Sequence, residues 1–230
     1  MQLTVLDALN PNQAFPALDK ALGEPNGLIA VGGCLSSQRI LNAYRHGIFP
    51  WFNPGEPILW WCPDPRLVLF PDKLKVSRSL QKTLRKQLFQ IRYDCAFEQV
   101  IAACAAPRSD QGGTWITEDM KQAYLRLHRQ GIAHSVEAWQ DQQLVGGLYG
   151  IGIGQVFFGE SMFHHKTDAS KVVFAHLVGQ LSVWGYQLID CQVSSEHLFS
   201  LGAEEIPRKV FAGLLNRLCE LRPGGHAWQR

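Results

Sequence analysis

The chain has 230 residues, enough for one large hydrophobic core or two smaller ones. Hydrophobic types make up 46% of it and charged types 18%, and seven Trp and twelve Phe are available to fill an interior. This composition excludes a disordered protein. The formal net charge is only +2, which excludes a protein that attracts nucleic acid through its overall charge.

Segments that would target the chain or cross a membrane are not evident. No run of about 18 apolar residues occurs, and the first ten residues lack the pattern of a secretory signal, so we expect a soluble cytoplasmic protein without a membrane partner. The six cysteines form no C-x-x-C pair and no tight cluster with histidine. We therefore expect reduced thiols, no metal ion and no cofactor.

The first sixty residues are rich in Pro and Gly, with a short apolar run at 28–31 and a helical pattern at about 36–46. They predict a small, loop-rich α/β domain over residues 1–62. Pro63 and Pro65 interrupt regular structure, and we therefore expect a second domain over 63–230.

The second domain is expected to be α+β. A strand at 67–70 precedes helices at 77–87, 97–105 and 117–130. The apolar period then changes to two, which predicts an antiparallel β-meander of strands at 133–140, 144–154 and 155–163. A helix up to Trp184, a strand at 186–193 and helices at 194–200 and 208–221 complete the chain. This order is found in GNAT-type acyltransferases.

Two polar residues fall within the apolar strand that precedes residue 194. Alternation places Leu188, Asp190 and Gln192 on one face of this strand. Leaving Asp190 and Gln192 buried without partners would cost about 1 to 3 kcal/mol each. They form either an internal polar pair or part of a cleft, and this strand alone does not separate the two.

Glu160 brings a second carboxylate into the same sheet, inside an apolar run. Two acids beside one cleft suit a cationic substrate, which needs a counter-charge when it leaves water. The alternative is an ion pair of Glu160 with Lys166 or Lys171.

Glycines occupy most even positions of the second meander strand, at 146, 150, 152 and 154. Such a bare face admits either a ligand or a closely packed helix. It is not a dinucleotide fingerprint, because no helix follows directly.

Basic residues are concentrated between positions 66 and 92, where eight Lys or Arg accompany one acid. Arg78, Lys82, Arg85 and Lys86 share one face of the expected helix at 77–87. This face could follow the phosphates of an RNA, and a merely solvated helix face is the alternative.

Six strings of residues, in order along almost the whole chain, together resemble one family, the leucyl/phenylalanyl-tRNA–protein transferases. They are Gly47-Ile-Phe-Pro-Trp51-Phe52, Trp60-Trp61-Cys-Pro-Asp64-Pro-Arg66, Gly113-Thr-Trp115-Ile116, Gly159-Glu-Ser-Met-Phe163, Leu188-Ile-Asp190-Cys-Gln192, and Leu201-Gly202-Ala with Ile206-Pro207-Arg208.

The resemblance implies an enzyme that moves Leu, Phe or Met from aminoacyl-tRNA to the α-amine of a protein beginning with Arg or Lys, marking that protein for degradation. It also implies a GNAT-like second domain and a catalytic set in which Asp190 hydrogen-bonds the Gln192 amide, Gln192 orients the attacking amine and Glu160 lies nearby. A carboxamide has almost no proton affinity near pH 7, so positioning suits Gln192 better than general base catalysis.

The donor's terminal adenosine and acyl chain are then expected against five residues, Trp51, Trp115, Leu148, Phe157 and Leu177, and the basic helix is expected on the tRNA. A β-branched acyl chain should fit worse than Leu, Phe or Met. We expect a monomer.

Two other functions fit parts of the sequence. An acetyl-CoA-dependent N-acetyltransferase would share the order of elements, but residues 164–170 lack the glycines of a pyrophosphate loop. A non-catalytic tRNA-binding module would need only the basic helix.

Overall fold

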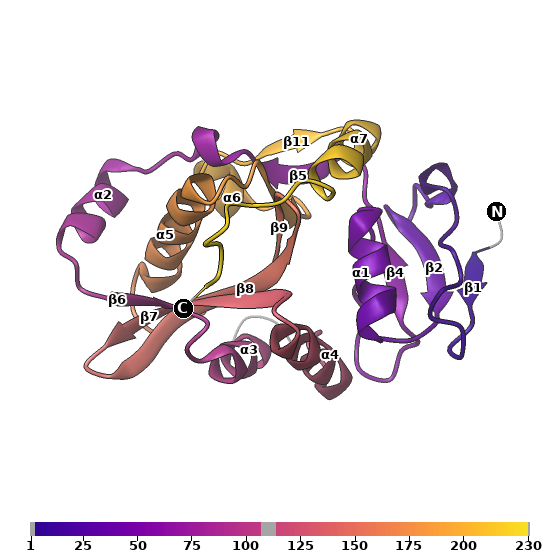
Figure 1. Cartoon of the computed structure of the whole chain (residues 1–230), viewed down its shortest axis with the longest axis horizontal. Helices are drawn as coiled ribbons and strands as arrows, with labels where there is room; N and C mark the ends of the chain where they lie inside the picture. Colours follow the sequence, from indigo (N-terminus) through magenta and orange to yellow (C-terminus); the bar gives the residue numbers. More distant parts are fainter. Residues whose placement is uncertain (1–2, 107–113, 230) are drawn as a thin grey trace.

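A computed structural model describes residues 3–106 and 114–229, which form two β-sheets (Figure 1). The first has the strand order β1-β2-β4-β3, with β1 and β2 parallel and the other pairs antiparallel. Its strands are β1 (Thr4–Leu6), β2 (Leu28–Gly32), β3 (Phe49–Pro50) and β4 (Leu59–Trp61). Helix α1 (Ser37–Arg45) and the short helix η1 (Leu18–Lys20) belong to the same part of the chain.

The second sheet has seven strands in the order β11-β5-β10-β9-β8-β7-β6, antiparallel except for the parallel pair β9 and β10. Its strands are β5 (Arg66–Leu69), β6 (Gln90–Tyr93), β7 (Ala133–Gln140), β8 (Gln143–Ile153), β9 (Val156–His164), β10 (Leu188–Gln192) and β11 (Glu204–Ile206). The expected α+β class and the central meander β7-β8-β9 are confirmed.

Helices cover both faces of the large sheet (Figure 1). The chain forms η2 (Pro71–Lys73), α2 (Arg78–Arg85), α3 (Phe97–Ala105), α4 (Glu118–Arg129), α5 (Ala169–Val183), α6 (Glu196–Ser200) and α7 (Arg208–Leu218). Apolar residues of α3 and α4 share one core with Tyr149 and Ile151 of β8. Those of α5 share the other core with Leu148. The alternation along β8 therefore divides its side chains between two layers, as a strand buried on both faces requires.

The glycines of β8 lie where other parts of the chain approach closely. A Cβ on Gly146 would lie 2.7 Å from the Cβ of Ala169 at the start of α5, and a Cβ on Gly150 would lie 2.6 Å from the Phe157 ring. At both positions close packing, and not a ligand, accounts for the absent side chain.

Two strands of the large sheet are not among the sequence expectations. β6 and β11 lie at opposite edges of the large sheet, and each is only three or four residues long. Short edge strands carry little alternation, which is why their patterns are weak. The expected domain boundary at 62 falls between β4 and β5, and the division of the chain there stays a prediction.

Candidate active site

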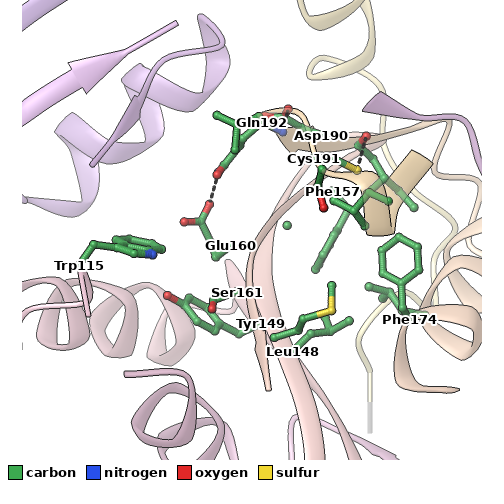
Figure 2. Close-up of a pocket in the computed structure, with 17 residues that line it drawn as sticks. Trp115, Leu148, Tyr149, Phe157, Glu160, Ser161, Phe174, Asp190, Cys191 and Gln192 are labelled. Carbon is green, nitrogen blue, oxygen red and sulfur yellow. Dashed lines mark hydrogen bonds between the residues drawn. The ribbon is translucent and has the colours of Figure 1, made fainter. Parts of the chain in front are cut away.

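The parallel neighbours β9 and β10 bring Glu160 and Gln192 together. Asp190 lies opposite Phe158 in their register. Gln192 and Glu160 each follow two residues later, and the Gln192 Nε2 donates to Glu160 Oε1 at 2.9 Å (Figure 2). Gln192 has a φ of +67°, and the pairing of β10 with β5 shifts between Asp190 and Gln192. The strand thus bends at Gln192.

This bend gives Asp190 and Gln192 different side-chain partners. Asp190 Oδ1 accepts the backbone N–H of Gln192 at 2.9 Å, while the carboxamide of Gln192 turns to Glu160. The expected hydrogen bond between Asp190 and the Gln192 amide therefore exists, but the donor is the backbone amide. Simple alternation does not predict this, because it assumes an unbroken strand.

Asp190 is fully buried in an ion pair with Arg66 of β5. Arg66 Nε donates to Oδ1 at 2.7 Å and Nη2 to Oδ2 at 2.6 Å, the bidentate geometry that suits a guanidinium. The guanidinium lies between the rings of Phe49 and Phe211, 4.8 and 4.7 Å from their centroids. Of the eight basic residues between positions 66 and 92, Arg66 therefore uses its charge inside the protein.

Glu160 is held by three hydrogen-bond donors. Tyr44 of α1 donates to Oε1 at 2.6 Å, Tyr124 of α4 donates to Oε2 at 2.8 Å, and Gln192 is the third. Burial nevertheless raises the pKa of Glu160 to about 7, although the hydrogen bonds from Tyr44 and Tyr124 oppose the shift. The alternative of an ion pair with Lys166 or Lys171 is wrong: Glu160 forms no ion pair among the described residues, and Lys171 pairs with Asp168 at 3.4 Å.

The two tyrosine hydroxyls are also within 2.6 Å of each other. Glu160 and the two hydroxyls thus make three oxygen–oxygen contacts. A hydrogen bond at each contact would need three protons, one from each tyrosine and one on the carboxyl group. With Glu160 ionised, both tyrosine protons point to the carboxylate and none remains between the hydroxyls. These two hydrogen bonds stabilise the ionised form of Glu160 and so oppose the effect of burial on its pKa.

Two cavities open beside Gln192. The larger, about 410 Å³, is bounded by apolar side chains of β8, β9 and α5, and by Glu160, Asp190 and Gln192 (Figure 2). The smaller, about 230 Å³, is lined by seven residues, Phe49, Pro50, Trp51, Trp115, Glu160, Gln192 and Val193. The last four also line the larger cavity, so Glu160 and Gln192 lie where the two meet.

The structure distributes the expected binding residues between these cavities. Leu148, Phe157 and Leu177 line the larger one, Trp51 lines the smaller one, and Trp115 lines both. Trp51 is 46% exposed, so its ring is accessible at the smaller cavity. All five residues thus line at least one of the two cavities.

The basic helix lies apart from them. Arg78, Lys82, Arg85 and Lys86 are exposed on or directly after α2 and line neither cavity. The hydroxyl of Thr83 donates to Asp168, which ties α2 to the start of α5.

Sequence reasoning missed four residues of the site. Tyr44, Tyr124 and Tyr149 are fully buried around Glu160, and Arg66 neutralises Asp190. The tyrosines come from α1, α4 and β8, segments whose approach no local spacing reveals. Only Arg66, a charged residue at the start of an otherwise apolar strand, offers a signal in the sequence.

The described part of the chain contains no group of three or more His, Cys, Asp or Glu placed to hold a metal ion. None of the helices within residues 3–106 and 114–229 has both the length and the apolar run needed to cross a bilayer.

A carboxamide and a carboxyl group lie where two cavities meet, and one of these cavities is lined by apolar side chains, an arrangement that fits the class of the protein, an acyltransferase. The sequence model described as leucyl/phenylalanyl-tRNA protein transferase matches residues 68–216, and that of the N-terminal domain of the same family matches residues 33–64. The chain belongs to the leucyl/phenylalanyl-tRNA–protein transferase family.

Relatives of that name match nearly the whole chain. The protein of Methylococcus capsulatus is 59% identical over 99% of this chain and 97% of its own length, and that of Ectopseudomonas mendocina is 62% identical over 88% and 90%. Solved structures resemble it only distantly. L-PGS from Bacillus licheniformis has a TM-score of 0.41 at 10% identity, covering 68% of this chain and 50% of that one. A GCN5-related N-acetyltransferase from Kribbella flavida has 0.38 at 14%, covering 73% and 59%.

Five of the six recognised strings lie wholly within the described residues. Gly113, the first residue of the string that ends in Trp115 and Ile116, lies outside them.

Proposed function

We propose that the protein transfers Leu, Phe or Met from the 3′ ester of aminoacyl-tRNA to the α-amine of a protein that begins with Arg or Lys. Its place in the family supports this reaction. The single observation that carries it for this chain is that Gln192 and Glu160 line both cavities, because an acceptor amine and a donor ester must meet at one point.

The larger cavity suits the acyl chain of the donor. Leu148, Phe157 and Leu177 are apolar, and a side chain such as Leu or Phe gains free energy by leaving water for such surroundings. Trp51 and Trp115 of the smaller cavity suit the terminal adenine, because bases stack on aromatic rings at about 1 to 3 kcal/mol per base.

Gln192 is assigned the role of orienting the amine. Its Nε2 is engaged with Glu160, which leaves its carbonyl oxygen to accept a hydrogen bond from the incoming amine. Asp190 supports this position through the Gln192 backbone N–H, and its charge is already compensated by Arg66. Asp190 is therefore a positioning residue and not a base.

Glu160 is assigned the role of proton acceptor. A pKa of about 7 lies near the working pH, where a general base is most effective. The amine nitrogen bonds to the ester carbon and gives one proton to Glu160. The carbon–oxygen bond of the ester then breaks, and the ribose oxygen leaves as a hydroxyl after receiving that proton. The ester is activated already, so no cofactor has to supply free energy.

The exposed basic residues of α2 suit the phosphates of the tRNA body. That the working form is a monomer stays a prediction. Aminoacyl-tRNA is a cytoplasmic metabolite, which supports that compartment.

Mass spectrometry of the acceptor tests the proposal. A peptide beginning with Arg, incubated with the protein and Leu-tRNA or Phe-tRNA, should gain the mass of one residue at its N-terminus. The matched control is the same peptide with an acetylated N-terminus, which offers no amine and should stay unchanged. No extension with Leu, Phe or Met would contradict the proposal, and acetylation of the peptide by acetyl-CoA would favour an N-acetyltransferase instead.

A further inference from the structure

The segment that follows α7 returns to the large sheet and ends beside β8 (Figure 1). Hydrogen bonds hold it there: the N–H of Gly224 donates to the carbonyl of Trp184 at 2.6 Å, and the Gln155 side chain donates to the carbonyl of Arg222 at 3.0 Å. This segment is part of the packed structure, although it contains no helix or strand.

Trp228, near the end of this segment, is held on several sides. Its ring lies flat on His134 of β7, with centroids 4.0 Å apart and an angle of 8° between the planes. Its Nε1 donates to the hydroxyl of Tyr186 at 2.8 Å, and the ring of Trp184 is 4.8 Å away. Trp228 has a φ of +59°, a conformation that a large side chain adopts only where its surroundings hold it.

The surface on which Trp228 rests is itself fixed. His134 is bonded through Nδ1 to Asp94 at 2.8 Å, and Asp94 also accepts the backbone N–H of Ser135 at 2.8 Å. The indole is thus supported by a ring that has little freedom to turn.

Trp228 also contacts the wall of the larger cavity. The centroid of its ring lies 5.8 Å from that of the Phe157 ring, with an angle of 25° between the planes. Phe157 is only 1% exposed. The Phe157 ring also lies against the backbone of Gly150, where a Cβ would be only 2.6 Å away. Phe157 therefore lies between the cavity and Trp228, and Trp228 does not itself line the cavity.

We propose that Trp228 is a specificity-determining residue: by supporting Phe157 from behind, it sets the size of the acyl chain that the larger cavity accepts. This inference rests on the proposed transferase function. It adds a residue from the far C-terminal end of the chain, outside the segments that match the family models.

The direction of the effect follows from the packing. Without the indole, the Phe157 ring has space behind it and can move away from the cavity, which deepens it. A larger acyl chain then gains more binding free energy from the deeper cavity than a smaller one. One methylene group more or less in an apolar pocket changes discrimination by about 10- to 200-fold, so we expect a change of about tenfold.

The experiment measures the ratio of kcat/KM for Phe and Leu, both attached to the same tRNA so that only the acyl group differs. In W228A the ratio of Phe to Leu should rise about tenfold, and in W228F, which keeps an aromatic ring, it should stay within about twofold of the wild type. H226A changes an exposed residue of the same segment and should leave the ratio unchanged. A ratio measured on one preparation is independent of the folded fraction, so a merely structural role would not change it.

Each outcome decides the inference. An unchanged ratio in W228A would overturn it, even if both rates fell together. If W228A does not fold, W228L, which retains an apolar side chain without a flat ring, replaces it and must shift the ratio in the same direction. Absence of transfer by the wild type would instead overturn the proposed function, and this inference with it.

Discussion

Arg66 and Asp190 form a bidentate ion pair, with both side chains almost completely buried beneath the point where the two cavities meet. Asp190 in turn accepts the backbone N–H of Gln192, so the pair fixes the residue that we assign to the acceptor amine. The negative charge of Asp190 is compensated within the protein, and Glu160 is left as the carboxyl group of the site without a basic partner among the described residues.

Replacing Asp190 by Ala should destabilise the protein by about 3 to 5 kcal/mol, because Arg66 would keep a buried charge without its partner. Urea unfolding followed by tryptophan fluorescence measures this change. The matched control is E204A, which removes the exposed pair of Lys73 and Glu204 and should cost less than about 1 kcal/mol. Equal unfolding midpoints for D190A and E204A would contradict the structural role of the pair.

Glu160 should govern the pH dependence of transfer. In the wild type, kcat/KM should rise as the pH increases through about 7, since the carboxyl group must be ionised to accept a proton. The Glu160→Gln variant should lose this part of the pH profile and react more slowly at all pH values. The remaining pH dependence should come from the acceptor amine, whose usual pKa is about 7.7 to 8.0. A pH profile of E160Q identical in shape to that of the wild type would exclude Glu160 as the base.

The hydroxyls of Tyr44 and Tyr124 should set the pH at which kcat/KM rises. Each donates to Glu160 and opposes the rise in its pKa, so Y44F or Y124F should raise the pKa further and move the rise in kcat/KM to higher pH. Y149F is the matched control, because the buried Tyr149 hydroxyl has no hydrogen-bond partner among the described residues. The comparison requires complete pH profiles of kcat/KM for the wild type and the three variants. A shift in Y149F as large as that in Y44F would contradict the prediction.

The ionisation of Glu160 should also make the stability of the protein depend on pH. The folded pKa of Glu160 is about 7 against an ordinary value of 4.5, so between these values the unfolded chain releases a proton that the folded protein keeps. The free energy of unfolding should therefore fall as the pH rises from 4.5 to 7, by at most about 3 kcal/mol and by less where cavity water screens the charge. Urea unfolding of wild type and E160Q at pH 5 and pH 7.5 measures it: the fall should be smaller in E160Q, and an equal fall in both proteins would contradict it.

Much of the large sheet could be predicted from the sequence, because its strands and helices carry strong periodic patterns. Helix α3 and strand β7 have the predicted bounds, and the other meander strands differ by one residue. The tight turn between β7 and β8 is supplied by Asp141 and Gln142, both with positive φ. Local signals were sufficient here since each strand pairs with its neighbour in the chain.

The site could be predicted only in part. Asp190, Gln192 and Glu160 stand out as polar residues in apolar strands, and the structure brings all three to the cavities. The left-handed backbone of Gln192 and the pairing of Asp190 with Arg66, 124 positions apart, depend on tertiary contacts. Tyr44 reaches Glu160 from 116 positions away, which no spacing along the chain can indicate.

The exposed basic residues of α2 should contribute to tRNA binding through charge alone. Each phosphate contact that is lost should reduce the slope of log Kd against log salt concentration by about 1, so R78A, K82A and R85A together should reduce it by about 3. Filter binding of Leu-tRNA over a series of salt concentrations measures the slope. Arg129 and Arg217 are also exposed basic residues, on α4 and α7, and R129A with R217A tests whether any loss of charge has the same effect. Equal slopes for the two sets of variants would mean that α2 is only a solvated helix. The helix would be assigned to tRNA binding if the α2 variant binds tRNA more weakly at low salt and regains peptide extension at high tRNA concentration.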